Sequence, residues 1–158
     1  MNYNNFIKTF KDHKILFERT NGCLYLASPF ALFTLRDPGT LPACLAAAAA
    51  PGDVKSIADR LAADITDSAW YTGLTFRRRD DVADLAIIEG KNKSGENYPV
   101  FVNTSFLNLM GSGAVVYGAG GEKGPVAVMN REGTAYILPV RVKNTERERL
   151  RDLVNNLL

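Results

Sequence analysis

The chain has 158 residues, of which 46% are hydrophobic and 23% charged, and its net charge is +2. This length and balance fit one globular domain with a buried core and exclude a mostly disordered chain. A net charge so close to zero does not by itself predict a nucleic-acid-binding protein or a binder of acidic ligands.

The cysteine spacing and the apolar segments point to an ordinary soluble domain. Cys23 and Cys44 have neither metal-ligand nor disulfide-framework spacing, so we expect reduced thiols. The polar N-terminal segment 1–5 lacks the layout of a signal peptide. The apolar run Ala43–Ala50 is too short to span a bilayer, which needs about 20 residues. We therefore expect a cytoplasmic protein without membrane contact, metal or cofactor.

The first 36 residues predict a helix and three strands. Asn4 or Asn5 can cap the helix, which presents Phe6, Ile7 and Phe10 on its apolar face. Asn21-Gly22 tolerates the positive φ of a type I′ turn, so the flanking segments 15–19 and 23–26 are predicted to form a hairpin. A third strand is predicted from Phe30 to Leu35.

Residues 37–97 have a different character, and we interpret them as an insertion. Alanine is intrinsically helical, so Ala43–Ala50 predicts a helix that Pro51-Gly52 ends. Asp53 is predicted to cap a second helix, and the helically spaced apolar residues of that helix are Val54, Ile57, Leu61 and Ile65. Two further strands, Trp70–Phe76 and Val82–Ile88, are predicted around a charged turn, followed by a polar loop at Gly90–Asn97.

Residues 98–142 repeat the first unit with an added opening strand. The predicted elements are a strand at Pro99–Val102, a helix start at Asn103, Thr104 and Ser105, a helix at Phe106–Met110 that ends at Gly111, and strands at Ala114–Tyr117, Val126–Met129 and Thr134–Val142. Residues 143–158 predict a C-terminal helix opened by the capping box Thr145-Glu146-Arg147-Glu148. The apolar stripe of that helix, which can pack on its own domain or on another subunit, is Leu150, Leu153, Val154 and Leu157.

The predicted fold class is therefore α+β. We expect a single domain, 1–158, built from two helix-plus-three-strand units (1–36 and 98–142), a helical insertion (37–97) and a C-terminal helix (143–158).

No catalytic or metal-binding motif is evident. The glycine-rich run Gly118–Gly124 is followed by a strand and lacks Ser or Thr after Lys123, so we interpret it as a hairpin loop and not a phosphate loop. Asp80, Asp81 and Asp84 stand beside three arginines and predict a neutralised surface turn rather than a cation site. The only histidine, His13, has no matched partner for nucleophilic or acid–base catalysis. We therefore expect no enzyme activity and assign no catalytic residue.

The two units together resemble one domain of the bacterial DNA sliding clamp, the beta clamp. The resemblance covers about 80 residues as patterns of apolar positions: the hairpin Phe17–Tyr25, the strand-to-helix run Phe101–Leu109 and the segment Tyr136–Val142. It implies helices that line a central hole, sheets that form the outer wall, contacts with duplex DNA and a groove for short peptides of replication proteins. A clamp has three such domains per chain, so a ring of this chain would need about six copies.

The resemblance and the charge pattern together give the candidate site residues. Basic residues that could contact the DNA backbone are Lys8, Lys11, Lys14, Arg77 and Arg79, for which a solvated charged surface is the alternative interpretation. The predicted second helix, from Thr104 to Met110, carries no positive charge. The resemblance places a peptide groove at Pro139, Val140 and Arg141, although the C-terminal helix can cover it instead.

These observations lead to one functional hypothesis and two alternatives. The first is a non-enzymatic, clamp-like accessory protein of a phage or mobile element that acts in DNA replication through protein or DNA contacts. The second is a small binding protein with an apolar pocket walled by Trp70, Tyr71 and Phe76. The third is an interaction or inhibitor module whose contact surface is the insertion.

Overall fold

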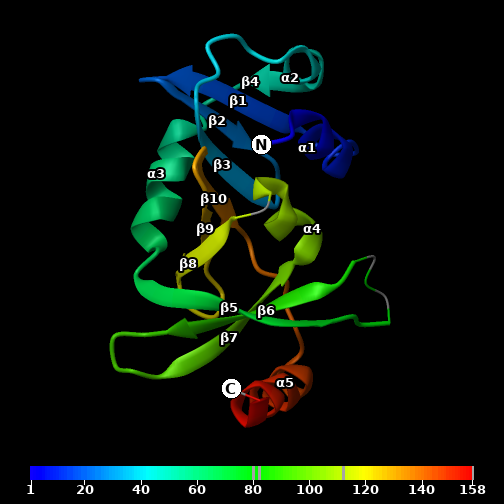
Figure 1. Cartoon of the computed structure of the whole chain (residues 1–158), viewed down its shortest axis with the longest axis vertical. Helices are drawn as coiled ribbons and strands as arrows, with labels where there is room; N and C mark the ends of the chain where they lie inside the picture. The colour runs from blue at the N-terminus through cyan, green and yellow to red at the C-terminus, as the bar shows by residue number, and fades with distance from the viewer. Residues whose placement is uncertain (80, 82, 112, 158) are drawn as a thin grey trace.

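The protein is described by a computed structural model covering residues 1–79, 81, 83–111 and 113–157. Its elements in chain order (Figure 1) are α1 (Tyr3–Thr9), β1 (Ile15–Thr20), β2 (Cys23–Ala27), β3 (Ala31–Arg36), α2 (Ala43–Ala48), β4 (Ala49–Pro51), α3 (Lys55–Asp64), β5 (Asp67–Phe76), β6 (Leu85–Lys91), β7 (Asn97–Asn103), α4 (Thr104–Leu107), the short 3₁₀ helix η1 (Asn108–Met110), β8 (Val115–Ala119), β9 (Val126–Met129), β10 (Gly133–Ile137) and α5 (Asn144–Leu157). The predicted α+β class is confirmed.

The described strands form one ten-stranded sheet with the order β4-β1-β2-β3-β10-β9-β8-β5-β6-β7. All neighbours are antiparallel except β1 and β4, which are parallel. The two predicted units, α1 with β1–β3 and α4 with β8–β10, therefore lie in mirror order on either side of the β3–β10 pair. This order follows from two meanders that pair through their last strands.

The helices cover both faces of this sheet. α1 and α4 lie on one face (Figure 1), where Phe10 and Phe106 have ring centroids 5.1 Å apart above the largest apolar cluster. On the opposite face α3 packs against β3 and β10, and the predicted stripe of Val54, Ile57, Leu61 and Ile65 is confirmed as its packed side. α5 contacts β7, and Leu150 packs against a third cluster that includes Phe101.

The insertion contributes strands as well as helices, on both sides of the two units. β4 extends the sheet beside β1, and β5 and β6 extend it beside β8. The predicted helix Ala43–Ala50 is too long, because Ala49–Pro51 pairs with Ile15–Phe17 instead. Alanine's intrinsic helix preference contributes little free energy, and pairing with the edge of β1 outweighs it here.

The Asn21-Gly22 hairpin is confirmed. Asn21 has φ 53° and Gly22 has φ 77°, as a type I′ turn requires, and Thr20 faces Cys23 directly across it. Asn21 is the only described non-glycine residue with positive φ. The turn therefore fixes the register of β1 and β2 through local chemistry alone.

Two helix starts differ from the predictions. The cap of α1 is Asn2, whose Oδ1 accepts from the backbone N–H of Asn5, and not Asn4 or Asn5. α3 is not capped by Asp53. Instead Oε1 of Glu18, on β1, accepts from the N–H groups of Val54 and Lys55 at 2.8 and 3.0 Å. A long-range carboxylate thus satisfies the first donors of α3.

The second unit and the C-terminal helix also differ at their ends. The predicted helix start at Asn103, Thr104 and Ser105 is confirmed, since Asn103 caps α4 and its Oδ1 accepts from Ser105 N–H at 2.8 Å, but the helix itself begins at Thr104 rather than Phe106. The predicted last strand Thr134–Val142 is wrong in length, because β10 ends at Ile137. α5 begins at Asn144, which places Thr145 inside the helix rather than at its cap.

Some predicted features fall outside the described part of the chain. Val82, Asp80 and the side chains of the α5 stripe residues Leu153, Val154 and Leu157 lie there.

Candidate partner-binding groove

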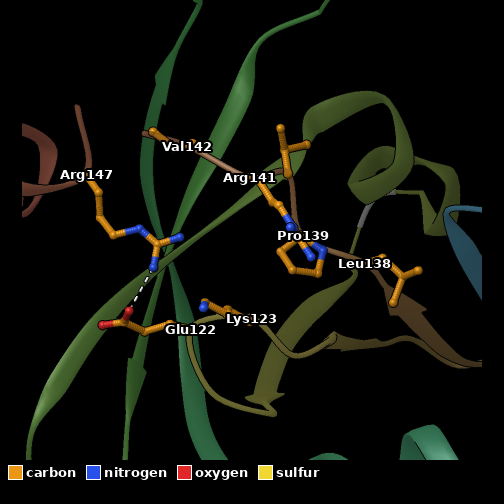
Figure 2. A pocket seen from close by; sticks show the side chains of 8 residues that line it. Glu122, Lys123, Leu138, Pro139, Arg141, Val142 and Arg147 are labelled. Carbon is orange, nitrogen blue, oxygen red and sulfur yellow. Dashed lines mark hydrogen bonds and ion pairs between the residues drawn. The ribbon is translucent and has the colours of Figure 1, made fainter. Parts of the chain in front are cut away.

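A groove of about 510 Å³ lies where the chain leaves the sheet for α5. Two segments line it: the loop that joins β8 to β9 and the segment between β10 and α5, with one residue from α5 itself. The lining residues are Glu122, Lys123, Leu138, Pro139, Val140, Arg141, Val142 and Arg147 (Figure 2). The three predicted groove residues, Pro139, Val140 and Arg141, are therefore among them.

The β8–β9 loop is a tight turn that needs its glycines. Gly120 N–H donates to the carbonyl of Pro125 at 2.9 Å, and Gly124 N–H donates to that of Gly121 at 3.2 Å. A Cβ on Gly124 would overlap the backbone of Gly120. The loop joins two antiparallel strands, as predicted, and presents Glu122 and Lys123 to the groove (Figure 2).

The other wall exists because the chain cannot continue β10. Leu138 N–H donates to the carbonyl of Phe30 at 2.9 Å, but Pro139 has no N–H for the next ladder bond. Val140 N–H then donates to the carbonyl of Phe101 on β7 at 2.7 Å. The segment therefore crosses from the end of β10 to β7, which explains why the predicted closing strand is short.

The groove combines an apolar floor with uneven charge. Val142 is buried, Pro139 and Val140 are half-buried, and Leu138 is 40% exposed. Glu122 and Arg147 form an ion pair of 2.8 Å at one side of the groove, away from Leu138 (Figure 2). The Arg147 guanidinium also lies 5.9 Å from the ring centroid of Phe101.

Two cations on the rim of the groove, unlike Arg147, have no ion-pair partner among the described residues. The side chains of Lys123 and Arg141 are exposed, and neither has a hydrogen bond or ion pair with any described residue. The groove therefore offers two unpaired positive charges beside the exposed apolar surface of Leu138.

A second, smaller cavity adjoins this groove on the α3 side. It has a volume of about 260 Å³ and shares Leu138 with the groove. Most of its lining is apolar, from the β2–β3 turn, α3 and β10: Ala27, Ser28, Pro29, Ala31, Leu32, Ile57, Arg60, Leu61, Tyr136 and Leu138. An extended ligand could thus contact both hollows across a single side chain.

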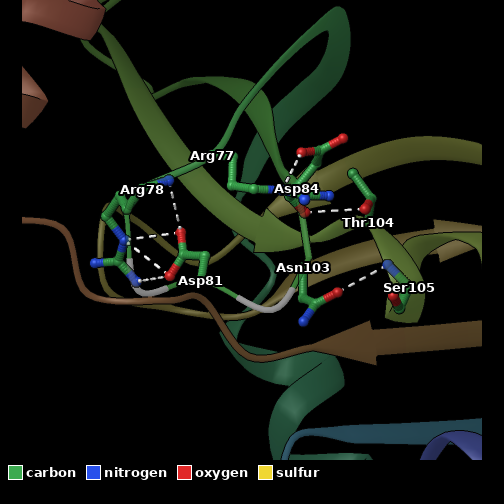
Figure 3. Close-up of polar contacts among 7 residues, drawn as sticks. All are labelled: Arg77, Arg78, Asp81, Asp84, Asn103, Thr104 and Ser105. Carbon is green, nitrogen blue, oxygen red and sulfur yellow. Dashed lines mark hydrogen bonds and ion pairs between the residues drawn. The ribbon is translucent and has the colours of Figure 1, made fainter.

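The arginine turn lies between β5 and β6 (Figure 3). Arg77 Nε donates to Asp84 Oδ1 at 2.9 Å, and the Arg78 guanidinium binds both carboxylate oxygens of Asp81. The hydrogen bond from Arg78 holds the pKa of Asp81 below its ordinary value. The predicted neutralised turn is thus observed for Asp81 and Asp84. Arg79 is exposed and its side chain makes no hydrogen bond or ion pair with the described residues.

The five predicted DNA-binding cations lie on two separate surfaces. Lys8 is on α1, and Lys11 and Lys14 are on the turn that follows it, all exposed. Arg77 and Arg79 are on the β5–β6 turn, and five strands separate β1 from β5 in the sheet. The structure therefore does not bring the five cations into one patch.

The predicted apolar pocket wall is also divided. Trp70 and Tyr71 are successive residues of β5 before its bulge, so their side chains lie on opposite faces of the strand. Phe76 packs edge-to-face on Phe101, with ring centroids 5.5 Å apart. Trp70, Tyr71 and Phe76 therefore do not form one surface.

The sequence predicts three of the eight residues that line the groove, Pro139, Val140 and Arg141. Lys123 was noted only within a glycine-rich run, and Leu138, Glu122 and Arg147 carried no signal of their own. The spacing of Gly120 and Gly124 around two charged residues is the one local pattern that could have indicated a charged loop tip.

Comparison with known proteins identifies no relative of this chain. No protein-family model matches the sequence, and neither a curated protein nor a solved structure matches it significantly. Within the described residues, no helix is both long and apolar enough to cross a membrane. The same residues contain no group of three or more His, Cys, Asp or Glu side chains placed to hold a metal ion.

Proposed function

We propose that this chain is a non-enzymatic accessory protein that binds an extended segment of a partner protein in the groove between the β8–β9 loop and α5. The observation that carries the proposal is the pair of unpaired cations, Lys123 and Arg141, beside the exposed side chain of Leu138. Such a surface is complementary to a segment that carries carboxylates next to an apolar residue. The resemblance of the sequence to a sliding-clamp domain is the reason for proposing a partner among the proteins of DNA replication.

The groove is suited to a short segment more than to a small molecule. It is an open surface hollow, and it shares the side chain of Leu138 with the cavity beside α3. A side chain of the partner could occupy that second cavity while its carboxylate faces Lys123 and Arg141. Exposed charges of this kind contribute mainly to specificity and association rate, whereas the apolar anchor contributes most of the affinity.

A panel of synthetic peptides tests this proposal. Fluorescein-labelled peptides with alternating Leu and Asp are compared with matched peptides in which Asn or Lys replaces Asp. We expect the acidic peptides to bind best. The double variant Lys123→Glu with Arg141→Glu should weaken their binding about tenfold or more, because like charges then face each other.

The matched control changes the net charge by the same amount on another surface. Lys8→Glu with Lys11→Glu, on and just after α1, should leave acidic-peptide binding nearly unchanged. If the basic peptides bind as well as the acidic ones, or if the control is as damaging as the groove variant, the proposal is wrong.

Duplex DNA binding within a ring is the second candidate function. It is favoured by the mirror order of the two units around the β3–β10 pair and by the position of α1 and α4 on one face. Lys8, Lys11 and Lys14 lie with α1, while α4 and η1 have no positive charge. A ring therefore has a weakly attractive inner surface.

Light scattering after size exclusion, with and without duplex DNA, tests this candidate. A ring predicts a mass near six protomers and a DNA affinity that falls steeply with salt. If Arg77→Ala with Arg79→Ala flattens the salt dependence, the turn contributes phosphate contacts. A monomer that ignores duplex DNA rules this candidate out and leaves the peptide proposal standing.

A further inference from the structure

A continuous ladder of aromatic rings runs from the core to the surface on the α1 and α4 side of the sheet. Successive ring centroids are 4.9–5.7 Å apart along Phe33, Phe6, Phe10, Phe106, Phe30 and His13. The first three rings are fully buried, whereas Phe30 is 38% exposed and His13 is exposed. The ladder therefore ends in two aromatic side chains that face solvent and are supported from below.

The exposed end of the ladder is held firmly. The rings of Phe30 and Phe106 stack with an interplanar angle of 15°, and His13 meets Phe30 edge-on at 86°. Ser28 Oγ accepts from the N–H groups of Phe30 and Ala31, and the Phe30 carbonyl accepts from Leu138. A fixed ring loses little conformational entropy when a ligand stacks on it.

The charges around this end favour an anion. The first 17 residues contain Lys8, Lys11 and Lys14 against a single acid, Asp12. The segments that supply Phe30 and Phe106 contain no Asp or Glu from Cys23 to Arg36 or from Asn97 to Gly121. The lysines are exposed, so the aromatic end is bordered by positive charge without neighbouring carboxylates from those two segments.

We propose that this surface binds single-stranded nucleic acid, with an unpaired base stacked on the ring of Phe30 next to His13 and with phosphates at Lys11 and Lys14. Aromatic rings next to cations are the combination that single-strand-binding proteins use, because every base has a face that can stack. A base pair inside a duplex is covered on both faces by its neighbours, so a blunt duplex offers a stacking face only at its two ends. The site is distinct from the peptide groove, and neither proposal depends on the other.

Fluorescence anisotropy with labelled oligothymidylate of about 12 nucleotides tests this, with a blunt duplex of equal length as the comparison. We expect the single strand to bind more tightly than the duplex. Phe30→Leu keeps an apolar side chain but removes the ring, and it should weaken single-strand binding roughly 5- to 100-fold. Lys11→Gln with Lys14→Gln should also lower the slope of log affinity against log salt by about 0.7 per lysine.

Trp70 provides a matched control, because at 39% exposure it is as accessible as Phe30. Trp70→Leu should leave single-strand binding unchanged. The chain has one tryptophan, so in the double variant Trp70→Phe with Phe30→Trp all tryptophan fluorescence comes from position 30. Oligothymidylate should quench that fluorescence and should not quench Trp70 in the natural protein.

The inference is overturned if the natural protein does not bind the single strand, or if the duplex binds equally well. It is also overturned if Phe30→Leu, shown to be folded by its melting transition, binds as tightly as the natural protein. Lys123→Glu with Arg141→Glu, the groove variant, should leave oligothymidylate binding nearly unchanged, which separates this site from the proposed peptide function.

Discussion

Nη1 of Arg78 donates a hydrogen bond of 2.9 Å to the carbonyl oxygen of Arg141, 63 residues further along the chain. The same guanidinium binds Asp81 through two nitrogens. Arg78 thus ties the β5–β6 turn to the wall of the groove and holds the backbone from which the exposed Arg141 side chain extends. The middle arginine of the triplet is a structural residue, while its neighbours are the candidates for ligand contact.

Replacing Arg78 should loosen this connection. Arg78→Ala leaves the partly buried Asp81 carboxylate without its bidentate donor, so we expect the free energy of unfolding to fall by about 1–3 kcal/mol. Urea denaturation measures the change. Arg79→Ala is the control and should cost less than about 0.5 kcal/mol, because its exposed side chain makes no hydrogen bond or ion pair with the described residues. Equal losses in both variants would contradict the assignment.

The long-range cap of α3 gives a second test. Glu18→Ala removes the acceptor of the Val54 and Lys55 N–H groups, and we expect a loss of about 1–2 kcal/mol in the free energy of unfolding. Asp53→Ala is the informative comparison, because Asp53 precedes the helix in sequence but makes no capping bond. Chemical denaturation of both variants should show Glu18 as the sensitive position. A larger loss at Asp53 would restore the cap that the sequence predicts.

The difference between Glu18 and Asp53 illustrates what sequence could predict here. Local chemistry was sufficient for the Asn21-Gly22 turn, because positive φ at two adjacent residues is decided by those residues. Periodicity was sufficient for the stripe of α3, because a helix of that length has one buried side. The cap of α3 could not be predicted, because the acceptor is Glu18 on β1, which is 36 residues before Val54 in the chain.

In the groove, too, the sequence predicts what depends on neighbouring residues and misses what depends on distant ones. The predicted strand Thr134–Val142 runs through Pro139, although proline cannot donate the next ladder bond. The prediction that Pro139 lies in a groove wall came from a resemblance rather than from the residues alone. The pairing of Ala49–Pro51 with β1 was missed for a related reason. A short segment pairs with a sheet edge only when tertiary contacts outweigh its intrinsic secondary-structure preference. Those contacts involve residues elsewhere in the chain, so the sequence of the segment alone does not predict them.

Gly90 lies in a regular strand, yet we expect even an alanine at this position to destabilise the fold. A Cβ at position 90 would overlap the ring of Tyr98, which faces it across β6 and β7. Gly90→Ala should therefore lower the free energy of unfolding by about 1–3 kcal/mol, even though alanine ordinarily suits a strand better. Gly52→Ala is the control, since its Cβ would meet only the flexible side chain of Leu16 at 3.3 Å. Thermal unfolding that ranks Gly52 as the more sensitive position would contradict this packing.

Two buried tyrosines predict how the protein responds to alkaline pH. Burial, with a hydrogen bond to Asp67, raises the pKa of Tyr98, and burial, with Tyr117 nearby, raises the pKa of Tyr136 to about 12. In the unfolded chain both titrate near their ordinary value of about 10. Below that pH both states hold the protons, so these groups do not change stability. Above it the unfolded state releases protons that the folded state keeps, and the free energy of unfolding falls as pH rises.

Denaturation at several alkaline pH values measures this slope, and the near-ultraviolet absorbance of tyrosinate reports the ionisation itself. Tyr136→Phe should reduce the slope between about pH 10 and pH 12 by roughly one proton, because the unfolded chain then has one fewer tyrosine to ionise. Trp70→Phe, which changes an exposed aromatic residue that does not titrate, should leave the slope unchanged. If Tyr136→Phe has the same slope as the natural protein, then Tyr136 ionises equally in both states and is not buried against α3, where the structure packs it with Val54 and Ala58.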